Sequence, residues 1–145
     1  MSAYETVLDA IIDALETAVI ACTSFTAKST HFDYVRTEDY GNYDPICLLS
    51  LQRDAIESIG PKETQHVLSF QARVSHTGTG TKTNLNEIVS YVGEIVDKIE
   101  SDRTLGSSYI ENTEITGIEY SQNAPQNFVV YYGFLSIEVL ALRNV

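Results

Sequence analysis

The sequence predicts an α+β fold, a mostly antiparallel sheet of about five strands with two helices packed on one face. Apolar residues recur at helical spacing in two segments, residues 3–22 and 84–100, and they alternate with polar residues in several others. The predicted order is helix, three strands, helix, two strands. That order favours an antiparallel sheet with both helices on one side.

The first predicted helix spans residues 3–22. Its apolar stripe consists of Tyr4, Leu8, Ile11, Ile12, Leu15 and Val19, and its other side carries Glu5, Asp9, Asp13 and Glu16. The acids lie near the helix start, where negative charge complements the positive end of the helix dipole.

Three strands are predicted next. Residues 29–38 are rich in β-forming side chains, and residues 46–51 are a short apolar run typical of a buried strand. Residues 52–62 contain the Gly60-Pro61 turn. Residues 64–76 alternate between apolar and polar side chains, which predicts a strand with one face in water.

The second helix is predicted to begin at Asn84, with Glu87 as its capping partner three residues later, and to end near residue 100. Two strands should follow, at about residues 108–120 and 127–142. The last strand is long and aromatic, and both of its faces carry apolar groups. We therefore expect both of those faces to be covered.

Length and charge narrow the possible functions. A chain of 145 residues suits one domain, predicted to span residues 1–145. Its 20 acidic and 9 basic residues give a net charge of -11, whereas DNA-binding proteins neutralise phosphates with Lys and Arg. We therefore expect no tight binding to DNA. The sequence contains no run of about 18 apolar residues, so no membrane span is predicted.

The sequence carries no recognisable metal or nucleophile motif. His66 and His76 lie on one predicted strand and face, but ten residues separate them by roughly 33 Å. His31 and Asp33 lack a third ligand nearby. We therefore expect no metal, no cofactor and no enzymatic activity.

Cys22 and Cys47 have no metal-binding or redox spacing. They are predicted to be small buried residues, because scattered free cysteines usually pack as small apolar side chains.

The stretch Gly78–Thr83 lies between a predicted strand and a predicted helix, where a phosphate cradle would be found. A P-loop needs glycine directly before its lysine, but Thr81 precedes Lys82, and His76 stands at the upstream glycine position. We expect a mobile loop that orders on contact with a partner. A small ligand-binding or enzymatic domain that uses this loop is the alternative.

Aromatic residues gather in the last two predicted strands: Tyr109, Tyr120, Phe128, Tyr131, Tyr132 and Phe134. Tyr and Phe are enriched at protein interfaces, so one side of the final strand could contact a neighbouring subunit. The alternative, in which all of them fill a single core, stays open. The candidate subunit-interface residues are Tyr131, Phe134, Gly78, Gly80 and Lys82.

The helix that carries Ile88, Val89, Val92, Ile95, Val96 and Ile99, the segment Ser101–Gly106 and the two closing strands together resemble the tail terminator and tail-completion (head-tail joining) proteins of tailed phages. The resemblance covers most of the chain by element order and residues 88–142 by sequence character. It implies a virion structural protein of the tail–neck region, assembled in the host cytoplasm. It also implies a homo-oligomeric, usually hexameric, ring that caps the tail tube.

The resemblance implies several partners: copies of the chain itself, the tail tube protein and a head-side connector or stopper protein. DNA would pass through the ring without specific binding. The family has no catalytic residues to carry over. Head-side stopper and adaptor proteins of the neck share this size and acidity, and a dimeric host-side adaptor is a further alternative.

Charge gives one more expectation for such a ring. Six subunits of -11 each would total about −66, and acids hidden only on outer surfaces would repel one another strongly. We expect several acids, with Asp102, Glu111 and Glu114 as candidates, to line or flank the central opening.

Overall fold

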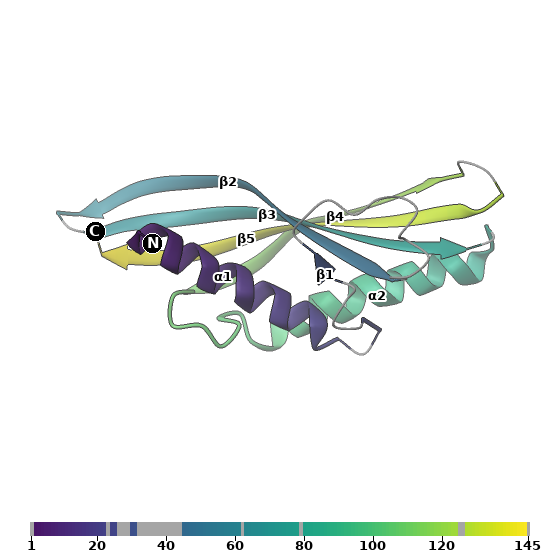
Figure 1. Ribbon diagram of the computed structural model, residues 1–145, viewed down its shortest axis with the longest axis horizontal. Coiled ribbons are helices and arrows are strands. Elements are labelled where there is room, and N and C mark those ends of the chain that lie inside the picture. Colours follow the sequence, from purple (N-terminus) through teal and green to yellow (C-terminus); the bar gives the residue numbers. More distant parts are fainter. Residues whose placement is uncertain are drawn as a thin grey trace.

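Both helices lie on the same side of a single sheet and meet near its middle (Figure 1). The computed structural model describes residues 2–22, 24–25, 30–31, 45–61, 63–78, 80–124 and 127–144. The elements are α1 (Ala3–Ile20), β1 (Thr30–His31), β2 (Ile46–Gly60), β3 (Glu63–Gly78), α2 (Lys82–Ser101), β4 (Asn112–Asn123) and β5 (Val129–Asn144).

The sheet has the strand order β1-β2-β3-β5-β4. The four long strands β2, β3, β5 and β4 are antiparallel to their neighbours, which confirms the predicted α+β class. The prediction of about five strands differs slightly, because the fifth member is the two-residue β1, which pairs in parallel with β2. Of the predicted strand at 29–38, only Thr30 and His31 are described, and Asp33 lies outside the described residues.

The face of the sheet under the helices, the helix face, carries the core. On β3 and β5, register pairs such as Leu68–Val139, Phe70–Ile137 and Ala72–Leu135 are fully buried. Helix α1 adds Ile11 and Leu15, and α2 adds Ile88, Val92, Ile95 and Ile99. Each large apolar side chain buried here stabilises the fold by about 1.5–3 kcal/mol.

The opposite face, the open face, is covered unevenly. On β5, Val130 is buried and Tyr132 is partly buried, whereas Ser136 and Glu138 are exposed. The prediction that both faces of this strand are covered is therefore wrong for its second half. From Leu135 to Val139 the strand alternates apolar and polar side chains, and the polar ones face solvent.

Helix α2 begins two residues earlier than predicted. Thr81 is its N-cap: the Asn84 N–H donates to Thr81 Oγ1 (3.3 Å), and the Thr81 hydroxyl donates to Asn84 Oδ1 (3.0 Å). Asn84 is therefore the third helical residue and not the first. Because β3 also continues to Gly78, the connection is shorter than the predicted loop of residues 77–83.

Strand β2 runs to Gly60, although its pattern predicted an end near residue 51. The register shifts between Leu51 and Arg53, so Gln52 is an extra residue in a β-bulge. A bulge reverses which residues face the core, so the alternation cannot be followed across it. Strand β4 has the same irregularity at Thr116, between Ile115 and Gly117, which also obscured its bounds.

Candidate assembly surface

Strand β4 forms one edge of the sheet and exposes two large side chains on the helix face. Ile118 and Tyr120 lie on this face because their register partners are Leu135 and Gly133 of β5. Their exposed fractions are 40% for Ile118 and 45% for Tyr120.

One flank of α2 exposes two more apolar side chains, Leu85 at 43% and Val89 at 46%. At about 100° per residue, both lie to one side of the buried stripe of α2. The other side carries Glu87 and Tyr91, which contact His76 on β3. Since β3 and β4 lie on opposite sides of β5, Leu85 and Val89 face towards β4.

These four residues, Leu85, Val89, Ile118 and Tyr120, are called the α2–β4 patch below. The two elements approach each other across Gly133 of β5. A Cβ atom at Gly133 would lie 2.5 Å from Val92 Cγ2 and 3.7 Å from Tyr120 Cε1. Large apolar side chains gathered at the surface mark an interaction site, because covering them removes apolar area from water.

At the opposite edge of the sheet, β2 and β3 form an arm that contains the second exposed apolar cluster. Ile56 of β2 is 63% exposed on the helix face, opposite His66 in register, and Ile59 is also exposed. A polar network holds the arm to α1: Asp54 accepts hydrogen bonds from the Tyr4 hydroxyl (2.9 Å) and from His66 Nδ1 (2.9 Å).

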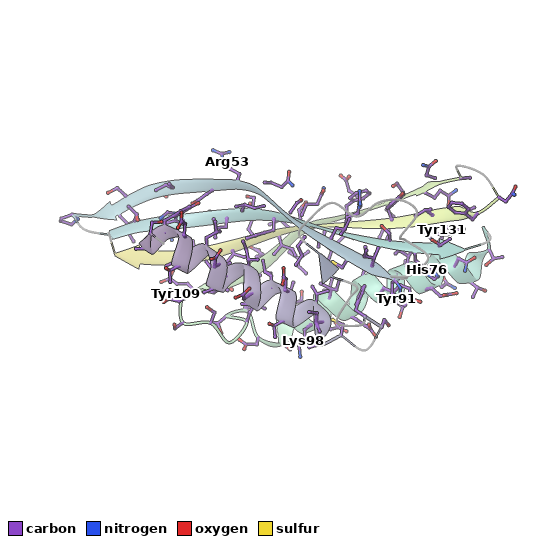
Figure 2. The ribbon with its side chains drawn as sticks, viewed as in Figure 1. Arg53, His76, Tyr91, Lys98, Tyr109 and Tyr131 are labelled. Atoms are coloured by element: carbon purple, nitrogen blue, oxygen red, sulfur yellow. The ribbon has the colours of Figure 1, made fainter. Side chains whose placement is uncertain are left out.

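The open face carries both an exposed cation and an exposed acid on β2, Arg53 and Glu57, and only acids at the β4 edge. Arg53 projects from β2 away from both helices (Figure 2) and is exposed. Towards the opposite edge of the sheet, β4 and β5 expose Glu114, Glu119 and Glu138 on the same open face. Glu114 lies directly opposite Glu138 in register, a like-charge pair that destabilises an isolated sheet.

The two aromatic interface candidates lie on different faces. Tyr131 belongs to the core beneath α2 and is only 4% exposed, so its ring has little surface to offer a neighbouring subunit. Phe134 lies on the open face and stacks on Tyr132, with ring centroids 5.9 Å apart. The assignment of either residue to a subunit interface stays a prediction.

The candidates in the connection before α2 have local structural roles. A Cβ at Gly78 would meet the side chain of Asn84, which would have to move, and Gly80 adopts a φ of 90°. Lys82 is the first residue of α2 and is exposed. Thr81 and Asn84 cap each other where a phosphate would have to bind, and a partner contact at these residues stays a prediction.

The three candidate channel acids do not share one face. Asp102 follows α2 on the helix side, and hydrogen bonds from the Thr104 hydroxyl (2.8 Å) and the Thr104 N–H (3.1 Å) hold the pKa of its carboxyl below the ordinary value. Glu111 precedes β4, and its N–H donates to the Leu140 carbonyl (2.8 Å). Glu114 lies on the open face.

The described part of the chain contains no group of three His, Cys, Asp or Glu residues placed to hold a metal ion. His66 pairs with Asp54, whereas His76 Nε2 lies 2.9 Å from Glu87 Oε2. Within the described ranges, no helix is long and apolar enough to cross a membrane.

Both cysteines are free and buried, as predicted. Burial raises the pKa of the Cys22 thiol to about 11 and that of Cys47 to about 12. A nucleophilic cysteine needs a lowered pKa, so neither thiol is activated for chemistry at neutral pH.

The sequence pattern did not predict most of the α2–β4 patch, although the sequence contains a signal for this patch. The predicted stripe of the second helix contains Val89, and with the neighbouring Leu85 it is wider than the sheet can cover. Ile118 and Tyr120 alternate with polar residues as a core strand would. Only the position of β4 at the sheet edge leaves them exposed.

No protein-family model matches the sequence, and no curated protein matches it significantly. Among solved structures, a chain from the "Virion of native gene transfer agent (GTA) particle" is similar over 93% of this chain and 92% of that chain. The TM-score of this match is 0.42, with 9% sequence identity.

Proposed function

We propose that this chain is a structural subunit of a phage-like virion that assembles with copies of itself. The α2–β4 patch is the observation that carries this proposal. It places Leu85, Val89, Ile118 and Tyr120 in water beside a sheet edge that has no partner strand among the described residues, where a partner would bury them. A surface of this kind serves assembly better than it serves catalysis.

The specific role that we propose is a tail terminator, a ring that caps the tail tube and joins it to a head-side connector or stopper protein. The sequence resemblance supports this role. The fold also suits a ring, because the two edges of the sheet carry different exposed surfaces. Contact between unlike surfaces of identical subunits produces a closed ring when the rotation between neighbours closes.

The charge of the chain supports a role beside DNA without binding to it. Acids line the solvent side of both helices, among them Asp9, Asp13, Asp97 and Glu100, and the open face exposes Glu57, Glu114, Glu119 and Glu138. With a net charge of -11, the subunit repels phosphates instead of neutralising them. A ring of such subunits would let DNA pass.

Tail-tube assembly with and without the purified chain tests this proposal, with tube ends imaged by negative-stain electron microscopy. We expect a ring at one end of each tube and shorter tubes when the chain is present. Val89→Asp should abolish this capping because it places a charge in the α2–β4 patch. The matched control is Ile20→Asp, at a similarly exposed position of α1 outside the patch.

The alternative neck roles give different outcomes in the same experiment. A stopper or adaptor would bind isolated head-side connectors and leave tube length unchanged. If the folded chain binds neither tubes nor connectors, the proposed virion role is wrong.

A further inference from the structure

We propose that neighbouring copies join by extending the sheet, with the β2 edge of one copy pairing antiparallel with the β4 edge of the next. This inference rests on the proposed self-assembly and names the surfaces that carry it. β2 and β4 are antiparallel to each other within one subunit, because three antiparallel pairings separate them. A neighbour related by rotation about an axis along the strands therefore presents β2 to β4 in antiparallel direction.

Among the described residues, both edges have the length and the unpaired positions that this pairing needs. β4 is a 12-residue strand whose only described partner is β5. In the described residues, β1 covers β2 only at Cys47 and Leu48, which leaves the stretch beyond Leu48 without a second strand. Neither β4 nor this part of β2 contains Lys or Pro, which commonly protect sheet edges from pairing, and the bulges at Gln52 and Thr116 lie outside the stretches 53–57 and 117–121 that would pair.

Apolar side chains are exposed at both edges on the same face. Ile56 of β2 and Ile118 and Tyr120 of β4 all lie on the helix face. When a sheet continues from one copy to the next, its faces also continue. Ile56 of one copy would then cover the α2–β4 patch of its neighbour and remove both apolar surfaces from water.

Apolar matching and charge together select the register of the pairing. If Ile56 lies opposite Ile118, Arg53 is diagonal to Glu119, and Glu57 faces Gly117 on the open face. A shift that places Ile56 opposite Tyr120 brings Glu57 against Glu119, and like charges directly opposite destabilise a strand pair. The opposite shift places Arg53 against Glu119 but sets the Asp54 carboxylate against Ile118, so Ile56 loses its apolar partner. The first register is therefore favoured, because it pairs Ile56 with Ile118 and keeps Glu57 from lying directly opposite Glu119.

This register also fits a closed ring. Across the sheet, Ile56 pairs in register with His66, which pairs with Ala141 of β5, whereas Ile118 pairs with Leu135 of β5. Placing Ile56 opposite Ile118 therefore offsets neighbouring copies by six residues along β5. Six residues span about 20 Å, and four strands span about 19 Å across the sheet. Strands must then tilt by about 45° to the ring axis, close to the tilt of closed barrels.

Disulfide cross-linking tests the register directly. In a chain with Ile56→Cys and Ile118→Cys, oxidation should link successive copies into a ladder on a non-reducing gel, because opposite side chains lie within disulfide reach. The matched control pairs Ile20→Cys with Ile118→Cys and should give much less linkage, because these positions do not face each other in this register. The buried Cys22 and Cys47 thiols should not contribute, since both have a raised pKa.

A charge exchange provides a second readout. Arg53→Glu should lower the assembled fraction by about fivefold, and adding Glu119→Arg in the same chain should restore it. Absence of the cysteine ladder in folded protein, or an equal ladder in the control, would overturn the inference. Capped tubes without the ladder would leave the proposed function intact, and a ladder without capping would contradict that function while supporting this interface.

Discussion

His66 Nδ1 lies 2.9 Å from Asp54 Oδ2, at the place where α1 meets the β2–β3 arm. The same carboxylate oxygen accepts a hydrogen bond from the Tyr4 hydroxyl at 2.9 Å. Because a carboxylate only accepts, the His66 ring must carry a proton on Nδ1. Three elements, α1, β2 and β3, are thus connected through one carboxylate that is almost covered.

Removal of this carboxylate should loosen the arm. We expect Asp54→Ala to lower the free energy of unfolding by about 1–3 kcal/mol, because it leaves the Tyr4 and His66 donors buried without their acceptor. Asp13→Ala, at an exposed position of α1, should change it by less than about 0.5 kcal/mol. Urea denaturation measures both values, and equal effects would show that the network does not stabilise the fold.

Two glycines should respond to alanine with opposite signs. Gly133→Ala places a methyl group against Val92 in a packed contact and should destabilise the protein by about 1–3 kcal/mol. Gly93 lies within α2 with nothing within 4 Å of an added Cβ. Gly93→Ala should therefore stabilise by about 0.5–1 kcal/mol, and thermal unfolding of both variants checks the pair.

The two buried thiols should be unreactive until the protein unfolds. Burial raises the pKa of Cys22 to about 11 and that of Cys47 to about 12, so both remain protonated at pH 8. A thiol reagent such as DTNB should label neither in native protein and both in urea. Rapid native labelling would contradict the packing described for α1 and β2.

The same shifts predict a pH dependence of stability. A raised folded-state pKa stabilises the fold below the unfolded pKa of about 9 and loses this contribution as pH rises through the folded pKa. Between pH 9 and 11, the protein should lose more stability than a variant with Cys22→Ala and Cys47→Ala. Equal losses would show that the thiols do not contribute.

The unmodified protein should show no affinity for duplex DNA at about 0.1 M salt, because its acids exceed its bases. In a ring closed with the helices outside, the open face and Glu114 would lie towards the hole. Glu114→Lys with Glu138→Lys should then create DNA binding by assembled protein, whereas Asp102→Lys on the helix side should not. Fluorescence anisotropy with labelled DNA measures this, and tight binding by the unmodified protein would exclude a passive channel.

Periodicity alone predicted the two helices and the order of elements, because each segment has a strong apolar pattern. It failed where backbone geometry changes the pattern. The bulge at Gln52 hid the second half of β2, and the reciprocal cap between Thr81 and Asn84 moved the start of α2. Such features depend on hydrogen bonds and register that composition does not encode.

The candidate surface was harder to predict than the fold, because exposure is decided by strand order. Tyr131 and Tyr120 are both aromatic residues of the closing strands, yet Tyr131 is in the core and Tyr120 is exposed at the edge. The sequence shows that both residues are suitable for burial. Only the placement of β5 inside the sheet and of β4 at its edge separates the two roles.

Mass photometry with negative-stain imaging of the purified chain, alone and bound to tail tubes, tests the central claim most directly. We expect closed rings of one mass, on tubes if not in solution. Ile118→Lys should abolish them by placing a charge in the α2–β4 patch, and Ile20→Lys should leave them intact. A chain that stays monomeric under both conditions, or rings that persist in folded Ile118→Lys protein, would contradict assembly through this surface.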